Sequence, residues 1–523
     1  MALWITDWRV GGNCWGTSLF DGFRTIRTDA RTQSNQFDEA RQDTFERRLS
    51  EAQAFGAASG GLSGRRPDLS ARHGLTIGQR LFGWLVVIAF VASLFVATEL
   101  TLAVSIKAVA VMFGLLIIIR FVAAAFAMAP RASANTAVVA DANLPVITLL
   151  IPLYKEAAVL PDLIEAIGAL DYPRHKLDVK LLIEADDAET LEAIRATDAF
   201  NRFEVIPVPP GAPRTKPKAL NYGLHFARGD LVAIFDAEDR PARNQLRVAA
   251  AAFARGHRKL AVVQAPLNIH NGRDGWLAAQ FEVEYAIHFR VWLPFLAKIG
   301  APLALGGTSN FFRRDVLVEA GGWDAWNVTE DADIGLRLSR LGYRAAMIAP
   351  ETDEEAPAKL KPWLNQRTRW MKGYLQTWLV LNRAPIRAAR GMGLFNYLLT
   401  QVTLGGSLLA AMTHGPLLVW TAASATTMSV EAWHVALFGL GYGSALAAAL
   451  ASGAQHARFV MLLTLPLYWP LQSVAMVRAL YEMKRKPHHW AKTPHGAFKA
   501  AAIDAKPAPV VREDNVVQLP LPF

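Results

Sequence analysis

The sequence predicts a mostly parallel α/β domain inserted between α-helical transmembrane segments. Apolar residues are concentrated in two blocks, Leu81–Met128 and Leu394–Met483, each long enough to cross a bilayer. Between the blocks, short β-branched runs alternate with helical segments, a pattern typical of strand–helix–strand units in a parallel sheet. The two observations together indicate a soluble α/β insert in a membrane protein.

The composition is that of a basic and rather apolar chain. Of its 523 residues 52% are hydrophobic and 19% are charged, the net charge is +10 and the isoelectric point is about 9.6. Lys and Arg flank the apolar segments more than they form a separate basic face, which favours anionic lipid over nucleic acid as a partner. The single cysteine, Cys14, excludes an intrachain disulfide and a cysteine-based zinc site.

The first apolar block follows a polar N-terminal region. Residues 1–80 are rich in Arg, Gly and Ser, and we expect a weakly ordered cytosolic region, although part of Gln36–Ala54 has helical character. Leu81–Leu100 and Val104–Met128 each hold about 20 apolar residues, enough for a hydrocarbon core about 30 Å thick. Residues 81–128 are therefore expected to form a transmembrane hairpin with its polar loop outside, and a buried hairpin of a soluble protein is the alternative.

Residues 143–355 carry the α/β pattern. The expected strands are Val146–Pro152, Val179–Ala185, Phe203–Val208, Leu231–Asp236 and Ala261–Gln264. The expected helices are Ala157–Leu170, Thr190–Asp198, Ala219–Ala227 and Pro241–Ala254. Sheets of this kind bind ligands at the carboxyl ends of their strands, so residues just after strands are the first candidates for a site.

The second apolar block is preceded by interface helices at residues 356–393. Pro357–Arg383 is amphipathic and rich in Trp, Lys and Arg, as is typical of a helix at the membrane surface. Within residues 394–483 the expected spans are Tyr397–Ala422, Val430–Ala451 and Phe459–Leu480. Three spans would place the C-terminus outside, whereas the basic segment Lys484–Lys492 favours the inside, so five or six crossings remain open. Residues 484–523 are otherwise expected to be a mostly disordered tail.

Acidic residues follow three of these elements. Asp236, Glu238 and Asp239 end a buried strand, and carboxylates at this spacing can bind a hard divalent cation and through it a diphosphate. A solvated turn is the alternative. Asp186 and Asp187 end an earlier strand and could accept hydrogen bonds from a base or ribose.

The third acidic cluster, Thr329-Glu330-Asp331, lies after the glycine-rich stretch 306–310. An aspartate facing a sugar acceptor could take the proton of its hydroxyl group as a general base. Capping of a helix by Thr329, with the acids in the first turn, is a competing interpretation that is compatible with the first.

The interface helix carries Gln366-Arg-Thr-Arg369-Trp370. The spacing places Gln366, Arg369 and Trp370 on one helical face, where the guanidinium can pair with diphosphate oxygens and the indole can stack on a sugar ring. A Trp–Arg anchor at the membrane interface is the alternative.

Taken in order, these motifs resemble the D, D, D, QxxRW pattern of processive family 2 glycosyltransferases. The resemblance runs over about Val146–Trp370 and implies a GT-A (Rossmann-like) catalytic domain that transfers a hexose from a UDP-sugar with inversion. Under this resemblance Asp331, with Glu330 beside it, is the catalytic base, and Mg²⁺ or Mn²⁺ is the cofactor. The remaining implied roles are nucleotide-sugar binding by Tyr154, Glu156, Asp186, Asp187, Lys218, Asn221, Asp236, Gln366 and Arg369, metal binding by Asp236, Glu238 and Asp239, and acceptor binding by Trp370, Trp323 and Thr308.

Within that family the stretches 184–190, 236–241 and 306–310 are most similar to bacterial curdlan and mixed-linkage β-glucan synthases. Glu238 departs from the family's DxD pattern, so Asp239 would share the metal role. The resemblance implies a multi-pass enzyme of the bacterial inner membrane, with its catalytic domain in the cytosol, UDP-glucose as donor and a growing polysaccharide in a transmembrane channel. Secretion partners are compatible with this role, and nucleic acid is not expected. The alternative is a non-processive transferase that adds one sugar to a lipid-linked acceptor.

Overall fold

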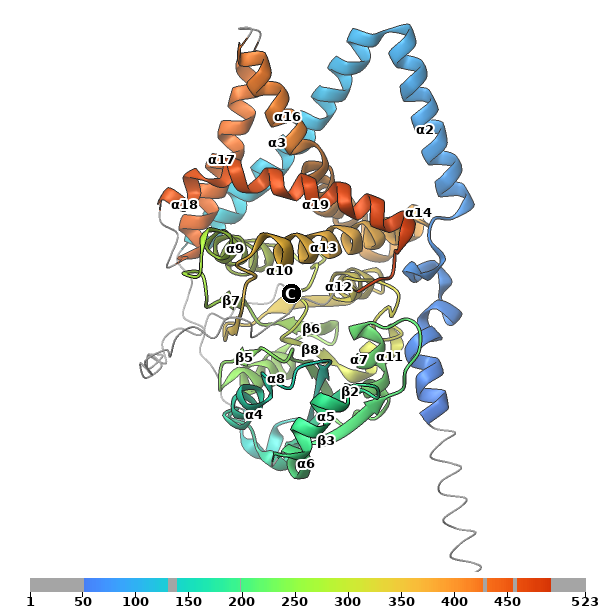
Figure 1. Ribbon diagram of the computed structural model, residues 1–523, viewed down its shortest axis with the longest axis vertical. Helices are drawn as coiled ribbons and strands as arrows, with labels where there is room; N and C mark the ends of the chain where they lie inside the picture. Colours follow the sequence, from blue (N-terminus) through green and yellow to red (C-terminus); the bar gives the residue numbers. More distant parts are fainter. Residues whose placement is uncertain (1–50, 130–138, 198, 427–429, 455–458, 491–523) are drawn as a thin grey trace, which may run out of the picture. The chain divides into compact units, whose positions relative to one another are not determined.

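The computed structural model describes residues 51–129, 139–197, 199–426, 430–454 and 459–490. Residues 57–523 form one compact unit, and the structure discussed below lies within it (Figure 1). The expected helical character of Gln36–Ala54 concerns residues that lie mainly outside the described ranges.

The α/β half of this unit is built on a seven-stranded sheet. Its order is β3 (Glu204–Val208), β2 (Leu177–Glu184), β1 (Ile147–Leu153), β4 (Leu231–Ile234), β8 (Asn310–Arg313), β6 (Leu260–Gln264) and β9 (Arg344–Met347). All neighbouring pairs are parallel except those that β8 makes with β4 and β6. The five strands expected from β-branched runs are confirmed, and the sequence pattern missed β8 and β9.

Helices on both faces bury the sheet. They are α4 (Leu160–Gly168), α5 (Ala188–Arg195), α6 (Ala199–Arg202), α7 (Lys216–His225), α8 (Gln245–Arg255), α11 (Arg314–Glu319) and α12 (Glu330–Arg340). The apolar residues of β1, β2 and β4 form one continuous core with α4 and α8, in which Leu149, Leu181 and Ala233 are fully buried. Burial on both faces explains why these strands are apolar without alternation.

A small second sheet stands beside the first. It has the order β5 (Arg240–Pro241), β10 (Thr352–Glu354) and β7 (Leu267–Ile269). Buried Gln245 donates to Thr352 Oγ1 at 2.9 Å and to the carbonyl oxygen of Glu351 at 3.2 Å. These bonds fix the start of β10, and Glu354 is the last residue of this strand.

A layer of helices connects the α/β half to the apolar segments. It consists of α9 (Trp276–Ile287), a π-helical turn (His288–Trp292), α10 (Leu293–Lys298), α13 (Leu360–Leu381), α14 (Pro385–Met392), α15 (Leu394–Thr400), α18 (Phe459–Leu463) and α19 (Leu465–Arg485). Figure 1 shows α13 and α19 running alongside each other between the sheets and the long apolar helices. The helix expected at the interface from Pro357–Arg383 is therefore present as α13.

Four helical segments in the described part of the chain are long and apolar enough to cross a membrane. They are α2 (Ile77–Val96), α3 (Thr98–Met128), the continuous segment Leu394–Thr426 that ends in α16 (Gly406–Thr426), and α17 (Ala432–Ser452). The first begins with a capping box in which Thr76 and Gln79 satisfy each other's backbone N–H groups.

The expected span Phe459–Leu480 is wrong. Helix α18 ends at Leu463, and α19 begins two residues later and lies along α13. Thr464, between the two helices, accepts hydrogen bonds from the side chains of Trp276 and Gln280 on α9. Four crossings in place of five or six would keep the basic segment after α19 on the same side as the N-terminal region.

The N-terminal region is more ordered than expected over its described part. Residues 57–65 are helical, and 3-10 turns follow at Pro67–Leu69 and Ala71–His73. Buried Asp324 accepts from Ser70 Oγ at 2.8 Å and from the backbone N–H of Ala71 at 2.5 Å. These hydrogen bonds hold the N-terminal segment on the α/β half, and hydropathy alone does not predict them.

The ion pair between α13 and α19 generates a prediction about stability. Buried Lys372 lies 3.0 Å from Glu482 Oε2, so Lys372→Met would leave that carboxylate partly buried without its main partner. We expect a loss of about 3 kcal/mol, observed as a lower thermal unfolding temperature in detergent. The exposed Lys361 on the same helix is the control, and Lys361→Met should leave that temperature unchanged. Equal unfolding temperatures for the two variants would contradict the assignment.

Candidate active site

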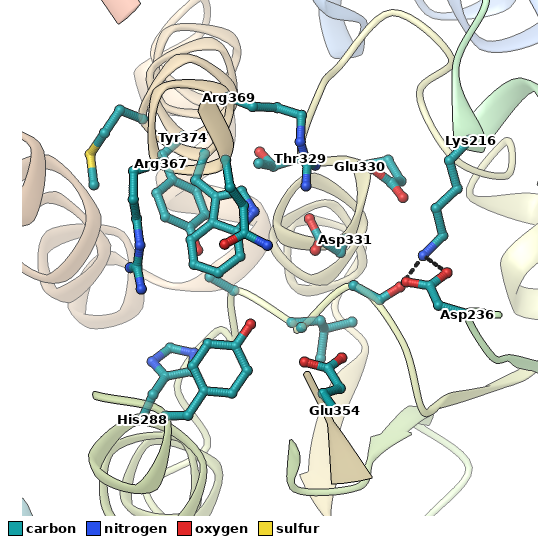
Figure 2. A pocket seen from close by; sticks show the side chains of 18 of the residues that line it. Lys216, Asp236, His288, Thr329, Glu330, Asp331, Glu354, Arg367, Arg369 and Tyr374 are labelled. Atoms are coloured by element: carbon teal, nitrogen blue, oxygen red, sulfur yellow. Dashed lines mark hydrogen bonds and ion pairs between the residues drawn. The ribbon is translucent and has the colours of Figure 1, made fainter. Parts of the chain in front are cut away.

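A cavity of about 770 Å³ lies where the strand ends, the start of α12 and helix α13 meet. Figure 2 shows acidic groups on one wall and arginine and aromatic side chains on the opposite wall. Of the residues expected from sequence, those that line it are Tyr154, Glu156, Asp236, Glu238, Glu330, Asp331, Gln366, Arg369 and Trp370. The remaining ones lie elsewhere, each for a specific reason.

The end of β4 divides its three acids between two roles. Asp236 and Glu238 line the cavity, whereas Asp239 is buried beneath them. Its Oδ2 accepts from the backbone N–H of Asp236 at 2.6 Å and from the hydroxyl group of Thr308. Burial, followed by the charge of Asp236, raises the pKa of Asp239 well above its usual range. Asp239 and Thr308 therefore hold the turn from below, which corrects the expectation that they bind metal and acceptor.

Lys216, which the sequence motifs did not predict as a site residue, faces Asp236. Lys216, at the start of α7, forms an ion pair with Asp236 and donates to the carbonyl oxygen of Gly307 at 2.8 Å (Figure 2). Although burial opposes its charge, Asp236 and Glu330 raise the pKa of Lys216, so it stays protonated. The signal was available in the segment Lys216-Pro-Lys218, whose two lysines lie on different sides of the first helical turn.

Lys218 and Asn221, expected at the nucleotide, are structural in this fold. Lys218 is fully buried, 3.0 Å from Glu184 at the end of β2. Asn221 donates to the carbonyl oxygen of Trp323 at 2.7 Å and accepts from its backbone N–H at 2.9 Å. Trp323 is itself buried edge-on against Phe312, with ring centroids 5.7 Å apart, so it is also removed from the acceptor side.

The acids after β2 lie at and behind the rim. Asp187 caps α5 by accepting from the backbone N–H of Thr190 at 3.3 Å, and it also accepts from the backbone N–H of Lys155 at 2.5 Å. Asp186 pairs with Arg214 at 2.8 Å, and Arg214 rather than Asp186 lines the cavity. Asp187 is thus buried behind the rim, Asp186 is exposed at it, and Arg214 faces the cavity.

Helix α12 begins at the cavity with Glu330 and Asp331. Thr329 occupies the cap position, but its side chain makes no capping hydrogen bond to the helix. Asp331 Oδ1 accepts from the backbone N–H of Ala332 at 2.7 Å, while its Oδ2 faces Gly307, where a side-chain carbon would lie 3.3 Å away. Gly307 thus leaves open space beside the second carboxylate oxygen of Asp331.

The two acids of α12 differ in how readily they ionise. Burial, followed by the charge of Asp331, raises the pKa of Glu330 to about 8. Burial also raises the pKa of Asp331, but the N–H of Ala332 and the charges of Lys216 and Arg369 oppose this rise. At neutral pH Glu330 therefore holds a proton, and the groups around Asp331 favour its ionised form more than those around Glu330 do.

A further acid comes from the small sheet. Glu354, at the end of β10, lines the same cavity as Asp236 and Glu238, and Figure 2 shows it on the side of Asp236 and Asp331. Burial, followed by repulsion from those two carboxylates, raises its pKa to about 8. The acidic segment 351–355 was visible in the sequence, but nothing there indicates that β10 brings it to the ends of the strands of the larger sheet.

Helix α13 supplies the opposite wall. Trp370 stacks against Tyr285, with centroids 6.2 Å apart and planes 25° apart. Arg367, not singled out from sequence, has its guanidinium 4.5 Å from the centroid of the Trp370 ring and pairs with Glu284 at 2.6 Å. Arg369 donates to the carbonyl oxygen of Val328 at 3.3 Å, and its guanidinium lies 4.5 Å from the centroid of the Trp490 ring.

The donor atoms around Asp236 fit a hard divalent cation in their chemistry. Asp236, Glu238 and Glu354 offer only carboxylate oxygens, the ligands that Mg²⁺ and Mn²⁺ prefer. Their mutual repulsion, seen in the raised pKa of Glu354, is what a cation would relieve. Among the described residues no three His, Cys, Asp or Glu side chains are arranged as a ready metal site, and Asp236 is paired with Lys216.

The raised pKa of Glu330 predicts a pH-dependent stability. Between about pH 5 and pH 8 the unfolded carboxyl loses its proton while the folded one keeps it, so the unfolding temperature should fall across this window. Glu330→Gln removes this group and should make the fall shallower. Glu319→Gln, on α11 outside the cavity, is the control and should keep the wild-type slope, measured by thermal unfolding in detergent. A slope unchanged by Glu330→Gln would refute the protonated state.

The comparisons with known proteins agree with this arrangement. Residues 145–373 match the family model described as glycosyltransferase-like family 2. The chain is 27% identical to a probable glycosyltransferase, YdaM, of Bacillus subtilis over 44% of this chain and 56% of the relative. It is also 27% identical to the beta-monoglucosyldiacylglycerol synthase of Trichormus variabilis over 52% of this chain and 60% of the relative. Identity to the UDP-forming cellulose synthase catalytic subunit of Pseudomonas fluorescens is 30% over 44% of this chain and 31% of the relative.

The chain thus spans 56–60% of the length of the first two relatives. The matched region begins just before β1 and ends within α13. It therefore takes in every strand of both sheets, together with the acids and the QxxRW residues that line the cavity. Residues 145–373 are thus similar to glycosyltransferase-like family 2 domains, and the mixed, mostly parallel sheet in this region has a GT-A type fold.

Proposed function

We propose that this chain is a processive, inverting synthase that polymerises a sugar from a UDP-sugar and moves the product across the membrane. The observation that carries the proposal is a second cavity of about 300 Å³ between α3, α16, α17 and α19. It adjoins the catalytic cavity, and the two share part of their lining. The shared residues are Leu116, Arg120, Glu284, Ile287, Met371 and Ser407.

The base is Asp331. It takes the proton of the acceptor hydroxyl group, whose oxygen attacks the anomeric carbon as the bond from that carbon to the phosphate oxygen breaks, with inversion. Its ionised state beside protonated Glu330 and its open approach past Gly307 support this role. One base suffices for inversion, so no covalent sugar–enzyme intermediate is required.

The donor would lie between the strand ends and α13. Tyr154 and Glu156 would contact the nucleoside, and Arg369, Arg214 and Lys216 would offer positive charge to the diphosphate. Asp236 and Glu238 would hold Mg²⁺ or Mn²⁺, with Glu354 as a further oxygen donor. When bound, the cation supplies Lewis-acid charge that neutralises the departing diphosphate.

The acceptor would stack on Trp370, whose ring orientation is fixed by stacking on Tyr285 and by the guanidinium of Arg367. From there the second cavity leads between the apolar helices. We propose a β-glucan, made from UDP-glucose with β-1,3- or mixed linkage, as the product, on the strength of the motif resemblance. We also propose a multi-pass position in the bacterial inner membrane, with the catalytic domain in the cytosol, and the four apolar helices and the positive charge after α19 support it.

A second candidate is transfer of one sugar to a lipid-linked acceptor. The likeness to a beta-monoglucosyldiacylglycerol synthase favours it, because that enzyme is named for a lipid product. The buried side-chain oxygens of Gln280 and Gln472, which lack a hydrogen-bond partner among the described residues, favour the polymer, since an acyl chain would leave them unsatisfied.

The role of Asp331 is tested by Asp331→Asn. We expect a loss of sugar incorporation of at least about 10²-fold, because the amide cannot accept the hydroxyl proton. Nucleotide binding should stay close to that of the wild type, measured by fluorescence titration. Asp315→Asn, in the exposed first turn of α11, is the matched control and should keep full activity. Wild-type incorporation by Asp331→Asn would rule out Asp331 as the base.

Donor and product are tested together with purified protein in lipid nanodiscs. Individual UDP-sugars are supplied, the product length is measured on gels, and linkage-specific glucanases digest it. The proposal expects long products from UDP-glucose that β-glucanases degrade. A product that stays at one sugar per lipid would establish the second candidate instead.

A further inference from the structure

Helix α3 carries a guanidinium group at the junction of the two cavities. Arg120 lies in a mostly apolar 31-residue helix that is long enough to cross a membrane, and its side chain lines both cavities. A charged group on such a helix is costly unless a partner compensates it, so its retention calls for a function.

The protein compensates Arg120 only weakly. Its Nη1 donates to Ser444 Oγ on α17 at 3.1 Å, and its guanidinium carbon lies 5.4 Å from the centroid of the Trp469 ring on α19. None of the ion pairs formed by the described residues includes Arg120. Glu284 is the acid among the residues that line both cavities. Its carboxylate already pairs with Arg367 at 2.6 Å and accepts from the hydroxyl group of Tyr468 at 2.7 Å.

The surroundings favour a sugar chain as the ligand at this place. The second cavity combines indole rings, which suit the apolar faces of sugars, with polar side chains that can bond hydroxyl groups. Its indole-bearing residues are Trp420, Trp433 and Trp469, and its uncharged polar ones include Gln280, His414, Thr421 and Gln472. Trp469 contacts Arg120 directly, so a sugar ring near this indole would bring its substituents close to the guanidinium.

We propose that Arg120 binds an anionic group, a carboxylate of a hexuronic acid or a comparable acidic substituent, on the glycan that leaves the catalytic cavity. The inference rests on the processive transfer proposed above and goes beyond it, because it names a glycan with acidic sugars in place of a neutral β-glucan as the chain in the second cavity. A guanidinium in a site of low dielectric forms its strongest hydrogen bonds with carboxylate-type oxygens, more than with neutral hydroxyl groups.

The test compares two trisaccharides that differ only in charge. Full-length protein in nanodiscs, without donor, is titrated with cellotriose and with the corresponding trimer of glucuronic acid, and tryptophan fluorescence reports binding near Trp469. We expect the wild type to bind the acidic trimer about tenfold more tightly than the neutral one. Arg120→Gln should abolish this preference, and Arg120→Lys should keep part of it.

Ser444→Ala is the matched control, because it removes the hydrogen bond to Arg120 and keeps the charge. It should retain the preference for the acidic trimer, and size-exclusion profiles check that every variant is folded. Equal binding of the two trimers by the wild type, binding of neither, or a preference that survives in Arg120→Gln would overturn the proposal. Sugar transfer by the wild type is assayed separately, so a failure of the proposed function appears as absent transfer while the trimer preference persists.

Discussion

The backbone of α13 comes very close to the start of α12 at Gly373. A side-chain carbon at this glycine would lie 2.4 Å from Thr329 Oγ1 and 2.7 Å from the backbone nitrogen of Thr329, so a larger residue cannot occupy the position without a shift of one helix. This contact brings Asp331, two residues after Thr329, to the same cavity as Arg369 and Trp370. On its other side α13 is tied to α19 by Lys372 and Glu482. The catalytic wall and the apolar helices therefore share one helix, and the site lies at their junction.

Charge is the second constraint on the site. Five acidic residues line one cavity: Asp236, Glu238, Glu330, Asp331 and Glu354. Their repulsion is reduced by the positive charges of Lys216 and Arg369 and by the raised pKa values of Glu330 and Glu354, which keep these two carboxyl groups protonated. The raised pKa values thus follow from crowding as well as from burial. A nucleotide diphosphate with its cation would rearrange this balance, because Lys216 is held by Asp236 in the absence of a ligand.

The sequence was sufficient for the features that depend on local pattern. Apolar runs located five strands of the sheet, and helical spacing placed Gln366, Arg369 and Trp370 on one wall of the cavity. Features that depend on tertiary contacts were beyond it. Glu354 reaches the site only because β10 pairs with β7, and Asp239 and Asn221 turn away because Thr308 and Trp323 bind them. Likewise α19 is apolar enough to suggest a span, but its ion pair and its packing along α13 are invisible in a hydropathy pattern.

The central claim is that a single carboxylate, Asp331, drives direct displacement at the anomeric carbon in this cavity. The configuration of the product tests it most directly. With an α-linked UDP-sugar as donor, proton NMR of the product formed by the purified wild type should show only β-configured new linkages. New α linkages would require a second displacement or a different attacking face, and they would contradict the account.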